Sequence, residues 1–80
     1  MNKMQGVACG VINISNKNCS YIVEIADNAK PGLAGRFSRI KLMEMDNSNV
    51  LANYDNGKWL VKPLNEAVDN AITDLIKRFE

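Results

Sequence analysis

The chain has 80 residues with ten basic and nine acidic side chains, which gives a net charge of +1, and 46% of its residues are hydrophobic. A chain of this length forms one domain, residues 1–80, and buries roughly 60–65% of its unfolded surface. The near balance of charge argues against a protein that coats nucleic acid or an acidic membrane, since such proteins carry a clear basic excess.

The first predicted element is a β-hairpin. Residues 6–14 and 19–26 are rich in Val, Ile and Tyr, which favours two strands joined by a four-residue loop at residues 15–18. In this register Cys19 lies opposite Ile14, and Cys9 lies opposite Glu24. The two cysteines then point to opposite faces of the hairpin, so they cannot form a disulfide within one subunit and are expected to be free thiols.

A loop, a third strand and a turn follow the hairpin. Residues 27–35 hold a proline and two glycines, which interrupt any regular element. Residues 36–45 are predicted to form a strand with Ile40 and Leu42 on one side. The other side of this strand carries Arg39, Lys41 and Met43. Residues 46–49, Asp-Asn-Ser-Asn, have the composition of a turn.

Asn56 and Gly57 predict a tight turn between two further strands, residues 50–55 and 58–62. Both residues accept the positive φ angles of a type I′ turn, so the register follows directly. The predicted cross-strand pairs are Asp55 with Lys58, Tyr54 with Trp59, Ala52 with Val61 and Leu51 with Lys62. Strict alternation places one set of residues on a single face of this hairpin: Val50, Ala52, Tyr54, Trp59 and Val61.

An amphipathic helix is predicted to follow, with Asn65 as its N-cap. Its apolar residues recur at i, i+3, i+4 and i+7. They are Leu64, Ala67, Val68, Ala71, Ile72, Leu75, Ile76 and Phe79. Acidic residues at the start of this segment and basic residues at its end match the helix dipole. The predicted fold is α+β, a five-stranded antiparallel sheet followed by one C-terminal helix packed on one face.

One helix covers only one side of such a sheet, which leaves the second face open. Alternation places six apolar residues there: Val7, Val11, Ile22, Met43, Leu51 and Leu60. Three basic residues share this face: Arg39, Lys41 and Lys62. A solvated sheet face is mainly polar, so the mixture indicates either a strand out of the assumed register or a surface that meets a partner. The simplest partner is a second copy of the chain, because twofold homodimers are the commonest oligomers.

A small phosphate-bearing ligand is another partner that the sequence suggests. A glycine-containing loop with flanking cations supplies the backbone N–H groups and the positive charge that hold phosphate. The candidate residues for such a site are Lys30, Gly32, Gly35, Arg36, Arg39, Lys41 and Lys62. The plainer interpretation is a crossover loop that needs glycine for its geometry, beside basic residues that solvate the third strand.

No catalytic or metal-binding pattern stands out in the sequence. The chain has no histidine, which removes Ser-His-Asp and Cys-His catalysis and the usual histidine-bearing metal sites. Carboxylates beside turns, such as Asp27, Asp46 and Asp55, fit turn formation better than acid–base chemistry. We therefore expect a protein that is not an enzyme and that has no metal or cofactor.

Two segments carry a family resemblance. They are residues 35–39, Gly-Arg-Phe-Ser-Arg, and residues 53–59, Asn-Tyr-Asp-Asn-Gly-Lys-Trp, followed by Pro63 and the predicted helix. Over roughly residues 30–80 the chain resembles a family of small bacteriophage and mobile-element proteins of Gram-positive bacteria. It departs from the pattern at Asn56, where the family usually has arginine, and at Lys58, which is inserted before the tryptophan. The resemblance implies a small phage or prophage accessory protein, but it assigns no site residue.

These observations predict a non-enzymatic binding protein, expected as a homodimer in the cytoplasm of its cell or host. By the resemblance it inhibits a host component, such as a defence protein, or sequesters a small phosphate-bearing ligand. The alternative is a single-stranded nucleic-acid-binding module in which Tyr54 and Trp59 stack on bases. Their predicted position under the helix favours core packing instead. No membrane association is expected, since the longest uncharged run, residues 4–16, is too short and too polar to cross a bilayer.

Overall fold

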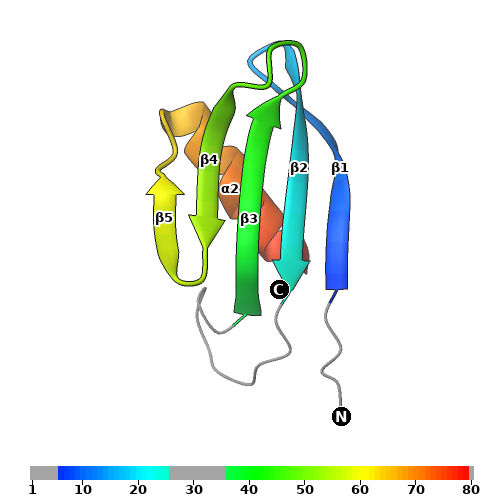
Figure 1. Cartoon of the computed structure of the whole chain (residues 1–80). Helices are drawn as coiled ribbons and strands as arrows, with labels where there is room; N and C mark the ends of the chain where they lie inside the picture. The colour runs from blue at the N-terminus through cyan, green and yellow to red at the C-terminus, as the bar shows by residue number, and fades with distance from the viewer. Residues whose placement is uncertain (1–5, 26–35, 80) are drawn as a thin grey trace.

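A computed structural model describes residues 6–25 and 36–79 of the chain. The elements are β1 (Gly6–Ile14), β2 (Lys17–Ile25), β3 (Phe37–Glu44), β4 (Val50–Asp55), β5 (Lys58–Val61) and the helix α2 (Glu66–Phe79). The strands form one antiparallel sheet in the order β1-β2-β3-β4-β5, and α2 crosses one face of it (Figure 1). The predicted α+β fold is confirmed.

The turn between β1 and β2 is tighter than the sequence predicts. Ser15 and Asn16 alone form it, with φ angles of 51° and 67°, and Ile14 pairs with Lys17. The predicted four-residue loop is therefore wrong, and Cys19 pairs with Ile12 instead of Ile14. A two-residue turn with two positive φ angles matches the twist of the flanking strands, so it extends the hairpin. The register moves by two positions, which leaves the predicted faces unchanged.

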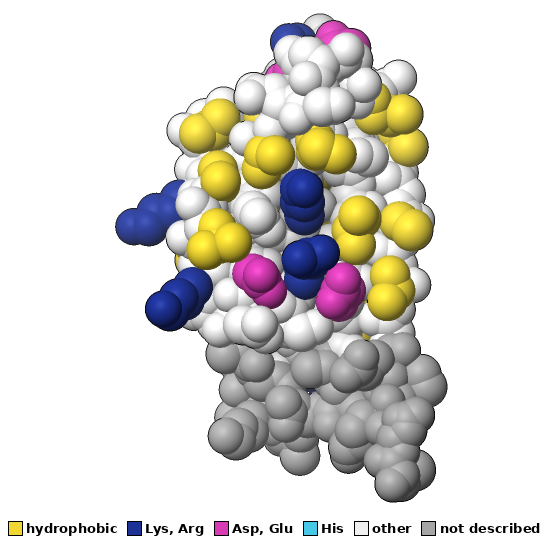
Figure 2. All heavy atoms as spheres, in the orientation of Figure 1, with side chains coloured by type: hydrophobic (Ala, Val, Ile, Leu, Met, Phe, Trp, Pro, Cys, Tyr) yellow, Lys and Arg dark blue, Asp and Glu magenta, His cyan; other side chains and the backbone are white. Residues whose placement is uncertain are grey.

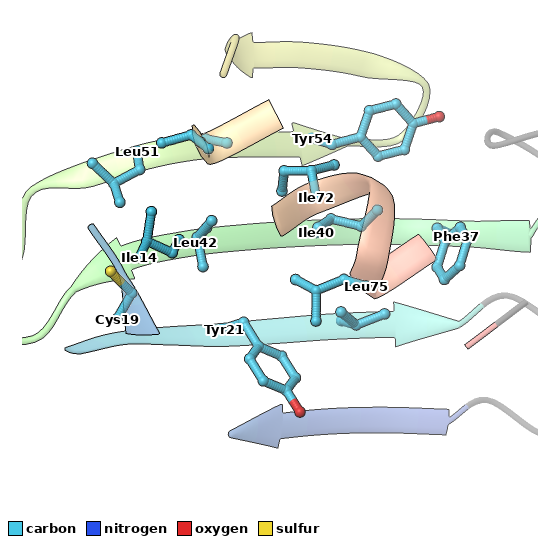
Figure 3. Packing of buried hydrophobic residues seen from close by; sticks show 13 residues of the cluster. Ile14, Cys19, Tyr21, Phe37, Ile40, Leu42, Leu51, Tyr54, Ile72 and Leu75 are labelled. Atoms are coloured by element: carbon cyan, nitrogen blue, oxygen red, sulfur yellow. The ribbon is translucent and has the colours of Figure 1, made fainter. Parts of the chain in front are cut away.

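The core lies between the sheet and α2. Ile40 and Leu42 of β3 pack in one cluster with Ile72 and Leu75 of the helix (Figure 3). Val23 of β2 belongs to the same cluster and is fully buried. Each of these side chains contributes roughly 1.5–3 kcal/mol when it is removed from water. The pairing of helix and sheet is therefore the main source of stability in the described part of the chain.

Two bulges correct the predicted faces of β4 and β5. Leu42 pairs with Ala52 while Met43 pairs with Val50, so Leu51 is an extra residue on β4. Its side chain is 7% exposed and belongs to the core, which contradicts its predicted place on the open face. The burial of leucine favours this bulge, because the same register change turns the smaller Val50 toward the other face.

The second bulge lies on β5. Tyr54 pairs with Trp59 and Asp55 with Lys58, as predicted, around a turn with positive φ at Asn56 and Gly57. The next pair is Asn53 with Val61, so Leu60 is the extra residue and the predicted pairs of Ala52 with Val61 and Leu51 with Lys62 are wrong. As a consequence, Val61 lies opposite a residue of the open face and not under the helix.

A third bulge lies at the start of β3. Glu24 pairs with Arg39 and Ile25 with Phe37, which leaves Ser38 as the extra residue. The hydroxyl of Ser38 donates a hydrogen bond to the carbonyl oxygen of Glu24, at 3.3 Å. Phe37 is thereby turned into the core, where it is fully buried.

The start of α2 is capped as predicted. Asn65 Oδ1 accepts a hydrogen bond from the backbone N–H of Val68 at 3.0 Å. This bond satisfies one of the N–H groups that the first helical turn leaves without a helical partner. Leu64, predicted as part of the apolar stripe, precedes the helix and is 61% exposed.

Tyr21 on β2 packs across Gly10 on β1. The two residues are cross-strand partners, and a Cβ atom added to Gly10 would lie 2.7 Å from the Tyr21 hydroxyl oxygen. The tyrosine ring therefore lies across the glycine, and its centroid is 6.3 Å from that of Phe79 in α2. Gly10 leaves room for an aromatic contact between the sheet and the helix.

We predict that Gly10→Val destabilises the protein, because the new side chain displaces the buried Tyr21 ring. Overpacking of this kind costs about 1–3 kcal/mol in the free energy of unfolding, measured by urea titration. Cys9→Val is the matched control, since Cys9 is an exposed neighbour on the same strand, and we expect it to change stability by less than about 0.5 kcal/mol. Equal effects of the two substitutions would contradict the role of Gly10.

We predict that Asn65→Ala lowers the free energy of unfolding by about 1 kcal/mol, because it removes the N-cap hydrogen bond. In a domain of this size the loss lowers Tm by roughly 4–8 °C. Asn70→Ala, at an exposed position inside α2, is the control and should leave Tm unchanged or higher, because alanine favours the helix interior. Thermal unfolding followed by circular dichroism distinguishes the two.

Candidate functional site

The candidate functional surface is the side of the sheet opposite α2, here called the open face. Cross-strand pairing arranges its side chains in three rows across the strands. The first row is Val7, Glu24, Arg39, Asp55 and Lys58; the second is Cys9, Ile22, Lys41, Asn53 and Val61; the third is Val11, Ser20, Met43 and Val50. Residues far apart in the sequence thus become neighbours on one surface (Figure 2).

The first row alternates in charge from β2 to β5 along Glu24, Arg39, Asp55 and Lys58. Arg39 Nη1 lies 3.7 Å from Glu24 Oε2, and the two side chains are 43% and 38% exposed. Figure 2 shows the result, with basic side chains in the middle of the face and an acidic side chain on either side. Two charges of each sign make this row electrically balanced.

The second row holds a cation beside an unsatisfied acceptor. Lys41 and Asn53 are cross-strand partners on β3 and β4. The Oδ1 atom of Asn53 is buried and accepts no hydrogen bond from the described residues. A buried acceptor without a donor costs about 1–3 kcal/mol in stability.

Apolar side chains flank the charged centre on both sides. Val7 and Val11 on β1 are 65% and 55% exposed, and Leu60 on β5 is 61% exposed. Ile22 and Met43 are half-buried between them. Five of the six predicted interface residues therefore lie on the open face, and Leu51 is the exception because its bulge turns it into the core.

The predicted phosphate site is not assembled by the described residues. Lys30, Gly32 and Gly35 lie outside them. Arg36 is half-buried directly before β3, and Arg39 and Lys41 occupy the first and second rows of the open face.

Lys62 lies in a different environment from the other candidate cations. It lines a hollow at the start of α2, together with Trp59, Pro63, Asn65, Glu66 and Asp69. The carboxylates of Glu66 and Asp69 in this hollow offset the positive charge of Lys62. The hollow is therefore a poor site for phosphate.

The sequence pattern identified the cations of the open face but not their acidic partners. The sequence did indicate the position of Asp55, because the Asn-Gly turn predicted that it pairs with Lys58. The structure confirms this pair. The place of Glu24 beside Arg39 depends on the register of β2 with β3, for which the sequence contains no turn signal. On its other side, Glu24 was predicted to lie opposite Cys9. The structure pairs it with Val7.

A second hollow lies between the end of β1 and the helix. Its volume is about 410 Å³, and Asp74 and Arg78 of α2 contribute charges of opposite sign to its lining. Within residues 6–25 and 36–79, no three Cys, Asp or Glu side chains gather in a way that could hold a metal ion. The described helix is too short and too polar to span a bilayer.

The two thiols have different surroundings. Cys19 is fully buried, and its Sγ donates a weak hydrogen bond to the carbonyl oxygen of Lys17 at 3.6 Å. Burial raises the pKa of the Cys19 thiol, and the nearby Glu44 carboxylate raises it further. Cys9 is exposed on the open face. Because the thiolate is the reactive form, chemical reactivity should be confined to Cys9.

We predict that a thiol reagent such as DTNB modifies one cysteine of the native protein rapidly and that this cysteine is Cys9. Modification of Cys19 requires unfolding, so we expect it to be more than about a hundredfold slower. Peptide mass mapping after timed quenching identifies the modified residue. Rapid modification of Cys19 in native buffer would contradict its burial.

Comparisons with known proteins give this chain no relative. No protein-family model, no curated protein and no solved structure matches it. The candidate surface is therefore interpreted from its own geometry and chemistry.

Proposed function

We propose that this chain is a non-enzymatic binding protein whose working surface is the open face. The observation that carries the proposal is a sheet face that the described helix leaves uncovered, in which a balanced row of charges lies between exposed apolar side chains. A solvated sheet face is mainly polar, so exposed apolar side chains on the same face as these charges indicate a surface that meets a partner.

The balance of charge favours a protein partner over a polyanion. Glu24 and Asp55 offset Arg39 and Lys58 in the first row, which leaves Lys41 as the excess charge of the three rows. Nucleic acids and acidic membranes attract surfaces with a strong basic excess, whereas a protein surface can match charges of both signs.

Single-stranded nucleic acid receives less support as a partner. Tyr54 and Trp59 contact each other edge to face, with ring centroids 5.1 Å apart, and Tyr54 is buried on the helix side of the sheet. Among the described residues, the three rows of the open face contain no aromatic side chain. A stacking platform for bases therefore has no place on this surface.

The family resemblance extends the proposal to the kind of system in which the protein works. By this resemblance the protein is a small inhibitor of a host component in the host cytoplasm. Sequestration of a phosphate-bearing ligand is the less favoured activity, since the carboxylate of Glu24 already lies beside Arg39.

Site-specific photo-crosslinking tests the proposal for any partner, because the probe reacts with whatever protein lies against it. Benzoylphenylalanine is placed singly at Val11 or Leu60 on the open face, and at Asn70 on the exposed side of α2 as the control. We expect irradiation of bacterial cells that express each variant to give adducts of discrete mass from the open-face positions and none from position 70.

Mass spectrometry identifies each adduct, and binding to the purified partner must then weaken when the charges of the open face are reversed. The same adducts from position 70, or no adduct from either open-face position, would contradict the proposal.

A further inference from the structure

We propose that the partner of the open face is a second copy of this chain, packed face to face about a twofold axis that runs parallel to the strands between β3 and β4. This inference rests on the proposed function and names the partner of the same surface. Two sheets packed in this way form an aligned sandwich, with their strands inclined by about 30° and their faces about 10 Å apart.

The four charges of the first row all pair under this symmetry, and Val7 on β1 lies beyond the partner's sheet. A twofold axis between β3 and β4 places β3 over the β4 strand of the other copy and β2 over its β5 strand. Arg39 then lies opposite the partner's Asp55. Glu24 lies opposite the partner's Lys58. Each contact occurs twice, so the four alternating charges of one copy all meet opposite charges.

Three pairs of the second and third rows also match under this axis, whereas Cys9, Val11 and Ser20 have no opposite residue. Lys41 lies opposite the neutral amide side chain of the partner's Asn53, so this contact brings no like charges together. Ile22 lies opposite the partner's Val61, beside the exposed Leu60 of that strand. Met43 lies opposite the partner's Val50. Apolar groups thus meet apolar groups.

Other twofold axes parallel to the strands pair the charges poorly. An axis along β3 places Arg39 against the partner's Arg39, and an axis along β4 places Asp55 against the partner's Asp55. An axis between β2 and β3 leaves Asp55 opposite the partner's Val7.

Axes that run across the strands bring cations together. Through or between the first two rows, they place Arg39 or Lys41 against the partner's Arg39 or the partner's Lys41. Like charges in direct contact across an interface are strongly unfavourable, so the charge pattern favours the axis between β3 and β4 over these alternatives.

Charge reversal with complementation tests this arrangement. Arg39→Glu places a glutamate opposite the partner's Asp55 twice per dimer, and Asp55→Lys places a lysine opposite the partner's Arg39 twice per dimer. We expect each variant to weaken the dimer by about a hundredfold in its dissociation constant, measured by sedimentation equilibrium.

An equimolar mixture of the two variants distinguishes this interface from any other. In the mixed dimer the glutamate introduced at position 39 of one chain faces the lysine introduced at position 55 of the other. The native Arg39 and Asp55 of the two chains face each other as before, so we expect the dimer to recover to within about tenfold of the wild-type affinity. Lys77→Glu, on the exposed side of α2, is the control and should leave the dimer unchanged. Circular dichroism establishes that each variant folds, and Glu24→Lys with Lys58→Glu replaces the pair if one does not.

A wild-type chain that stays monomeric at millimolar concentration overturns the inference, and so does a dimer that the mixture fails to restore. Neither result affects the proposed function, which fails only if the open face gives no specific crosslink. A monomer whose open face crosslinks to another protein would keep the binding surface and remove the second copy as its occupant.

Discussion

One helix covers one face of a five-stranded sheet, and the other features of this structure depend on that constraint. Ile72 and Leu75 of α2 close the core over the central strands, and the described chain offers no second helix for the opposite face. The side of the sheet under the helix must therefore be apolar to form the core. The residues of the opposite side are not constrained in this way and can be used for binding. The mixture of charge and apolar surface on the open face follows from this asymmetry.

The alternation of apolar and polar residues along the strands predicted most of the fold. In a sheet with one buried face, successive side chains point alternately to the core and to the surface, so apolar residues recur at every second position. The limits of β1 and β4, the Asn-Gly turn and the Asn65 cap were all predicted. The bulges were not, because each is decided by which side chain gains most from burial across several strands. Phe37 and Leu51 reach the core only through such an extra residue.

The sequence predicted many of the residues that lie on the candidate surface, but not how their charges are arranged across the strands. Parity alone placed Arg39 and Lys41 on the side away from the helix, and the structure agrees. The charged row requires the registers of β2 with β3, of β3 with β4 and of β4 with β5, and of its pairs only Asp55 with Lys58 was predicted, from the Asn-Gly turn. Cross-strand neighbours are set by turn geometry, which hydrophobic periodicity does not report.

Among the described elements, the outer edge of strand β1 is open to pairing with another chain. The strand is nine residues long, carries no charged side chain and, among the described strands, pairs only with β2. Its outer backbone N–H and C=O groups form a template to which another extended segment can hydrogen-bond, and charges or proline that usually discourage such pairing are missing from its sequence. The same chain is thus prone to grow its sheet sideways, so aggregation at high concentration would begin at this edge and not at the faces.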